Sequence, residues 1–108
     1  MDTTKGYQQG DVLLKMRDAM PEGGVPVNPG PRGYVLAEGE HTGHAHAMEA
    51  TPAVEMFERD GTLWLRVSEP TPLVHEEHHA QTVQPGVYEV GRVVEMDPFA
   101  DEVRTVAD

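Results

Sequence analysis

The sequence predicts a single all-β domain over residues 1–108, built as a small barrel or a sandwich of about seven or eight short strands. Its length is that of one domain. Eleven glycines and nine prolines are spread along the chain between short apolar runs, a pattern typical of strands joined by turns. Asp60-Gly61, a dipeptide favoured in tight hairpins, separates two runs of alternating apolar and polar residues.

The first half of the chain contains two expected strands and a long loop. Residues 1–9 are expected to form a flexible N-terminus. The apolar run over 11–16 predicts the first strand, and residues 34–37 predict the second. Between them, residues 21–33 hold four prolines and four glycines, and neither a helix nor a central strand tolerates that density. A loop is therefore expected there.

The second half is expected to contain the clearest strands. Residues 54–67 alternate around Asp60-Gly61 and predict a β-hairpin. Short apolar runs predict strands at 73–74 and 82–83, and 87–94 predicts a longer strand. Asp97-Pro98 is a typical helix start, so residues 97–108 are expected to form a short C-terminal helix or a tail.

The charge balance excludes several classes of partner. Eight basic residues stand against 19 acidic ones, giving a formal net charge of −11. No basic patch for nucleic acid or an anionic membrane can be assembled from so few cations. The chain has no cysteine, which excludes disulfides, thiol nucleophiles and cysteine-based metal sites. No apolar run reaches membrane-spanning length and no secretory signal pattern is present, so a cytoplasmic protein is expected.

All six histidines fall in two short clusters: His41, His44 and His46, then His75, His78 and His79. In an extended strand His44 and His46 point to the same face. The second cluster allows two geometries. If it is extended, His75, Glu77 and His79 share a face; if the chain turns, His75 and His78 converge.

Neutral imidazole is the most common protein ligand for transition metals. The two clusters therefore predict a site for a divalent transition metal, zinc first, with iron, nickel, manganese or copper as alternatives. The expected ligands are His44, His46, His75 and His78, whereas His41, Glu77 and His79 are expected around them. The metal would be structural if protein fills every position, or catalytic if one stays open to water. No substrate is indicated, and enzymatic activity is left undecided.

Two other interpretations of the histidines remain open. They could be solvated loop residues or residues satisfying buried hydrogen bonds. They could also line a subunit contact that holds at neutral pH and loosens near pH 5–6, because clustered imidazoles repel one another once protonated. Such a chain would be a non-enzymatic assembly module. Self-association is expected in either case, because small sheet proteins often cover their exposed edges in this way.

Two resemblances add to these expectations. The segments QQGDVLL, AEGEHTGHAH, LVHEEHH and PGVYEV resemble a family of small bacterial proteins without an assigned activity. In addition, residues 39–49 are similar to the first motif of cupins, which are small metal-binding β-barrels. That similarity implies His44, His46 and Glu49 as metal ligands. Glu89 stands where the second cupin motif has its histidine, so His75 or His78 would supply that nitrogen.

Overall fold

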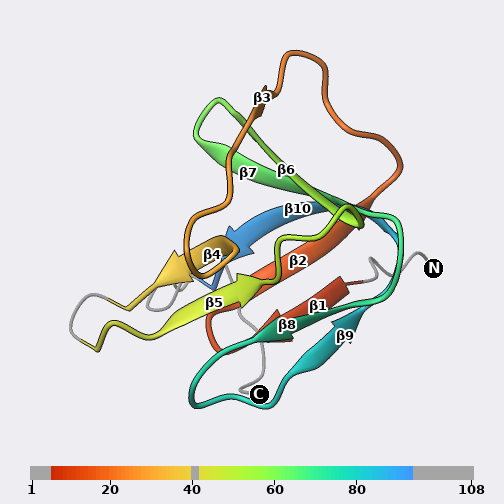
Figure 1. Ribbon diagram of the computed structural model, residues 1–108. Helices are drawn as coiled ribbons and strands as arrows, with labels where there is room; N and C mark the ends of the chain where they lie inside the picture. Colours follow the sequence, from red (N-terminus) through yellow and green to blue (C-terminus); the bar gives the residue numbers. More distant parts are fainter. Residues whose placement is uncertain (1–5, 40–41, 94–108) are drawn as a thin grey trace, which may run out of the picture.

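The structure, a computed structural model, describes residues 6–39 and 42–93, which form two antiparallel sheets (Figure 1). The larger sheet has the strand order β1-β2-β10-β7-β6-β3, and the smaller has the order β4-β5-β8-β9. The larger sheet consists of β1 (Gly6–Gln9), β2 (Val12–Arg17), β3 (Val25–Pro26), β6 (Val54–Arg59), β7 (Thr62–Val67) and β10 (Gly86–Arg92). The smaller sheet consists of β4 (Tyr34–Glu38), β5 (Ala45–Met48), β8 (Thr71–Val74) and β9 (Gln81–Val83).

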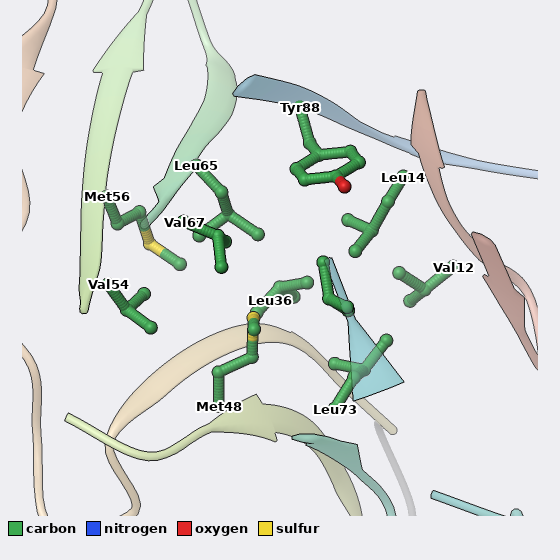
Figure 2. Packing of buried hydrophobic residues seen from close by; sticks show 11 residues of the cluster. Val12, Leu14, Leu36, Met48, Val54, Met56, Leu65, Val67, Leu73 and Tyr88 are labelled. Carbon is green, nitrogen blue, oxygen red and sulfur yellow. The ribbon is translucent and has the colours of Figure 1, made fainter. Parts of the chain in front are cut away.

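The core lies between the two sheets, so the fold is a sandwich and not a closed barrel. Figure 2 shows Leu65 and Tyr88 of the larger sheet facing Met48 and Leu73 of the smaller one. These four side chains are completely shielded from solvent. The buried apolar cluster consists of Val12, Leu14, Leu36, Met48, Val54, Met56, Leu65, Val67, Leu73, Val83 and Tyr88. The all-β expectation is confirmed in its sandwich form, and the barrel alternative is wrong.

The predicted hairpin is confirmed at residue level. Strands β6 and β7 pair antiparallel from Val54 opposite Val67 to Arg59 opposite Thr62. The turn residues Asp60 and Gly61 have φ angles of 53° and 80°. Two consecutive positive φ values match the right-handed twist of the flanking strands, and Asp-Gly adopts them at low cost. The alternating residues thus bury one face of the hairpin in the core.

Two expectations about chain organisation need correction. Residues 6–9 are not a flexible tail, because they form β1 and pair along β2 from Gly6 opposite Lys15 to Gln9 opposite Val12. Within the loop predicted at 21–33, β3 pairs with the edge of β6. Together with β5, these two elements bring the seven strands located from the sequence to the ten that the described residues form. The helix or tail expected over 97–108 lies outside the described residues.

Strand β5 carries the first histidine cluster into the sandwich. All four of its residues are buried. His46 and Met48 share a face because they are two residues apart, and Met48 lies in the core. His46 therefore faces the larger sheet.

Across the described parts of the chain, no helix is long and apolar enough to cross a membrane.

Candidate metal centre

The four histidines predicted as ligands converge at one end of the sandwich. The ring centroid of His75 lies 4.3 Å from that of His46, 4.6 Å from that of His78 and 5.6 Å from that of His44. The rings of His46 and His78 stack with centroids 5.7 Å apart. Residues 75 and 78 are brought together by a bend after β8, so the turned geometry of the second cluster is confirmed.

These imidazoles line a cavity of about 200 Å³. His46 is 5% exposed, whereas the other three rings are half-buried. The cavity is therefore closed at its base, where His46 lies, and open to solvent at its rim. The cavity is lined by Asp11, Ala37, Glu38, Gly39, Thr42, His44, His46, His75, Glu77, His78 and Arg92.

Three possible donor atoms lie close to one another. A nitrogen of His44, a nitrogen of His75 and a carboxylate oxygen of Glu76 all lie within 4.8 Å of one another. Glu76 is held in place because its Oε1 accepts a hydrogen bond from the backbone N–H of Ala45 at 3.0 Å. That hydrogen bond is the main reason why the pKa of Glu76 lies below its usual value. Glu76 is thus a carboxylate whose ionised form is favoured beside His44 and His75.

The side chain of Glu77 approaches the same cluster from the rim. Its Oε1 lies 3.7 Å from Nδ1 of His44. Its backbone N–H donates a hydrogen bond to Nδ1 of His75 at 3.0 Å. A neutral His75 ring that accepts at Nδ1 carries its proton on Nε2. Glu77 therefore contacts both His44 and His75.

His46 is held by a buried glutamine. Gln9 is 1% exposed, and its Oε1 lies 2.8 Å from Nδ1 of His46. The amide nitrogen of Gln9 donates to the carbonyl oxygens of Leu73 at 2.8 Å and His79 at 2.9 Å. Gln9 thus connects β1 of the larger sheet with β5, the end of β8 and the bend that follows it.

An ion pair lies on the other side of His46. Both Nε and Nη2 of Arg92 contact Oδ2 of Asp11, at 3.0 Å and 2.6 Å. The second oxygen of Asp11, Oδ1, lies 3.7 Å from Nε2 of His46. Partial burial acts to raise the pKa of Asp11, but the hydrogen bond and charge of Arg92 outweigh it, so this pKa is lowered. The cavity therefore has an ionised carboxylate beside a buried imidazole.

The environment of His46 keeps its ring neutral. Burial lowers its pKa to about 4, and the neighbouring His75 and His78 act in the same direction. Asp11 opposes them but does not compensate for them. Because only the unprotonated imidazole binds metals, His46 is in its ligand form at neutral pH.

Gly10 brings the β1–β2 turn into contact with the histidines. Its φ is +58°, in the left-handed region. A Cβ atom at this position would lie 2.7 Å from Nε2 of His78 and 3.2 Å from Cε1 of His46. Only a glycine fits such a turn against the two rings without displacing one of them.

The structure does not place all expected site residues at the cavity. Glu49 follows the last residue of β5, is exposed, and does not line the cavity. The side chain of His79 is exposed, and only its backbone carbonyl takes part, as the acceptor from Gln9. His41 lies outside the described residues. The carboxylate found close to His44 and His75 is Glu76 and not Glu49, and it lines a neighbouring hollow together with His75.

Four residues beside the histidines, at the first and last strands of the described chain, were not predicted from the sequence as site residues. Gln9, Gly10 and Asp11 come from the β1–β2 turn, and Arg92 comes from the end of β10. The available signal was the polar run Gln-Gln-Gly-Asp directly before an apolar strand, where a glycine turn places polar groups at a sheet end. No comparable local signal marks Arg92.

Comparison with known proteins gives a family but no activity. The chain belongs to the family described as Domain of unknown function (DUF8820), which matches residues 8–93. This range includes Gln9, Asp11, both converging histidine pairs and Arg92. No match was found among curated proteins or among solved structures. The expected membership in a family without an assigned activity is thereby confirmed.

Proposed function

We propose that this domain binds a divalent transition metal, zinc in the first place, in the histidine-lined cavity. The observation that carries the proposal is the convergence of His44, His46, His75 and His78 on one cavity from two segments of the chain. Without a cation, four imidazoles at such distances do little to stabilise one another, and their protonated forms repel. A bound cation makes this arrangement favourable, because each neutral ring donates an electron pair to it.

The residues present fit a transition metal better than calcium or magnesium. Imidazole nitrogens with one or two carboxylate oxygens suit zinc, iron, nickel and copper, whereas calcium and magnesium prefer oxygen ligands alone. We expect His44, His75 and Glu76 to form the first part of the donor set, because their atoms are already close together. His46 and His78, which line the same cavity as His44 and His75, are expected to complete it. A metal ion bound to Nδ1 of His75 would replace the hydrogen bond that this atom accepts from the backbone N–H of Glu77.

The half-open cavity supports an exchangeable position on the metal. Structural zinc sites are filled by protein ligands, whereas catalytic sites keep one position for water or substrate. Here three of the four rings remain partly exposed. A metal in such a site acts as a Lewis acid or lowers the pKa of a bound water. Glu77, 3.7 Å from His44, would then be the carboxylate nearest to that position.

Native mass spectrometry with added zinc, before and after a chelator, tests the proposal. We expect a zinc-sized mass increment on the wild-type chain that the chelator removes. His44→Ala and His46→Ala should each lose the increment, since each removes one ring from the cavity. His79→Ala is the matched control, because its exposed side chain lies outside the cavity and should keep the metal.

The same spectra separate the proposal from its main rival. Full zinc occupancy in both cavity variants would contradict the metal site described here. A metal-free oligomer that dissociates near pH 5–6 would instead favour the assembly module. The mass of the intact assembly in the spectra tests the expected self-association, and the ratio of zinc ions to chains shows whether chains share a site.

A further inference from the structure

We infer that Gln9 is a positioning residue for this site: it fixes the ring of His46 so that Nε2 is the atom offered to the metal. The inference rests on the proposed function and goes further, because it assigns a role to a residue outside the donor set. It starts from the side-chain amide of Gln9, which is 1% exposed and in contact with three polar groups.

The orientation of the Gln9 amide is determined by its neighbours. Its two outer contacts are backbone carbonyls, those of Leu73 and His79, and both can only accept hydrogen bonds. The NH₂ group has two N–H donors, and each carbonyl takes one of them. A flipped amide would set its oxygen against two other oxygens in a buried place, which is unfavourable. The amide oxygen of Gln9 must therefore face His46.

This orientation fixes the tautomer of His46. An amide oxygen only accepts, so the Nδ1 atom that lies 2.8 Å from it must carry the ring proton. The proton of a neutral ring is then on Nδ1, and the lone pair is on Nε2. The other tautomer would leave two buried acceptors facing each other, with no hydrogen between them.

The unprotonated ring atom of His46, Nε2, faces a carboxylate, and a cation between the two would be favourable. Nε2 of His46 lies 3.7 Å from Oδ1 of Asp11, and in this tautomer both atoms are electron-pair donors. Zn–N and Zn–O bonds of about 2.0–2.1 Å set two ligands of one tetrahedral ion roughly 3.3 Å apart. The present separation is only a few tenths of an ångström longer, so Asp11 is a further oxygen donor within reach of an ion held by His46, beside the donors proposed above.

Glutamine is better suited to this position than glutamate. A carboxylate could accept from Nδ1 of His46, but it would have no N–H to give to the carbonyls of Leu73 and His79. Gln9 therefore does two separable things: it ties β1 to the ends of the second histidine pair, and it selects the tautomer of His46. Variants can remove the first function alone or both together.

Nitrogen NMR of the metal-free protein, above the ordinary histidine pKa, tests the inference directly. Imidazole nitrogen shifts distinguish protonated from unprotonated ring atoms. We expect wild-type His46 to be protonated at Nδ1, and Gln9→Glu to keep that tautomer because its carboxylate still accepts. Gln9→Met should lose the preference, since it offers no acceptor. Wild-type His46 protonated at Nε2, or an unchanged tautomer in folded Gln9→Met, would overturn the inference.

Zinc affinity, measured by competition with a chromophoric chelator, tests the consequence for the metal. We expect Gln9→Met to weaken zinc binding by about 10–100-fold, the usual effect of losing a group that orients a ligand histidine. Gln9→Glu should bind more tightly than Gln9→Met. Gln81→Met is the matched control, because the Gln81 amide donates to the backbone carbonyl of Gln8, a comparable connection that touches no histidine.

The two measurements distinguish failure of the inference from failure of the proposed function. If wild-type protein binds no zinc, the proposed function fails and Gln9 has no metal to serve, whatever the tautomer. If wild-type protein binds zinc and Gln9→Met binds it equally well, only the inference fails. Equal losses in Gln9→Met, Gln9→Glu and Gln81→Met would assign Gln9 a purely structural role and would also overturn it.

Discussion

Gly10 is the residue at which backbone conformation and the candidate site depend on each other most closely. Its left-handed φ lets the β1–β2 turn approach His78 and His46 more closely than any residue with a Cβ allows. The dense spacing of the rings thus depends on a residue without a side chain. Sequence reasoning does not find such a role, because a glycine before a strand looks like an ordinary turn residue.

Replacing Gly10 separates backbone strain from this contact. We expect Gly10→Ala to lower the free energy of unfolding by roughly 1–2 kcal/mol, the cost of a left-handed conformation for an L-residue. It should also weaken zinc binding by about tenfold or more, because the new Cβ displaces the His78 ring. Urea denaturation and competitive zinc titration measure the two effects.

Gly61→Ala is the control for strain alone. Gly61 has a φ of +80° and nothing within 4 Å of an added Cβ, and it lies in the hairpin turn. It should lose stability comparably and keep its zinc affinity. Equal zinc affinities in the two variants would show that the contact of Gly10 with His78 does not shape the site.

At the level of elements, β8 is the strand that brings the second histidine pair to the cavity. His75 directly follows its last residue, and Leu73, two positions before His75, is fully buried in the core. The backbone carbonyl of Leu73 also accepts from Gln9. Packing of one leucine therefore fixes the place from which the bend at 75–78 starts.

Truncation of this leucine should affect both stability and metal binding. We expect Leu73→Ala to cost about 2–5 kcal/mol through the loss of buried contacts and the cavity left behind. Leu65→Ala on β7 should cost a similar amount, because Leu65 is equally buried in the other sheet. Only Leu73→Ala should weaken zinc binding to the folded protein. Calorimetric zinc titration at low temperature compares them, and equal affinities would contradict the role given to β8.

The elements that could be predicted are those whose sequence alternates. The β6–β7 hairpin has both the period of two and its Asp-Gly turn, so local rules determine it. Strand β1 has the sequence Gly-Tyr-Gln-Gln, and its pairing depends on β2. Strand β3 is only Val25–Pro26 at a sheet edge. Neither of these two strands has an alternating pattern of its own, so both were missed.

At the level of the whole molecule, the candidate site also contains residues that could be predicted from the sequence and residues that could not. The converging histidines were predictable, because they are clustered in the sequence and each cluster is local. Asp11 and Arg92 were not, because they meet only when β10 pairs with β2 and sets Arg92 opposite Val12. A register between strands so far apart in the chain cannot be deduced from either segment alone.

Metal binding should stabilise the whole sandwich. The cavity is lined by the smaller sheet and by the ends of β2 and β10, so an ion there favours the assembled state over the unfolded chain. At free zinc of about 100 times Kd, the gain is about 2.7 kcal/mol. Thermal unfolding with zinc and with chelator should show it in wild type and His79→Ala, but not in His46→Ala. The same zinc effect in His46→Ala would place the ion elsewhere.

The pairing of β2 with β10 has a consequence for synthesis on the ribosome. Contacts between Asp11 and Arg92 join positions 81 residues apart in the chain. During translation, both histidine clusters leave the ribosome before β10 does, yet the cavity wall is complete only after β10 has joined the sheet. A nascent chain that captures zinc early would do so with an unstructured set of histidines. The complete cavity proposed to bind zinc is therefore available only after β10 has been translated.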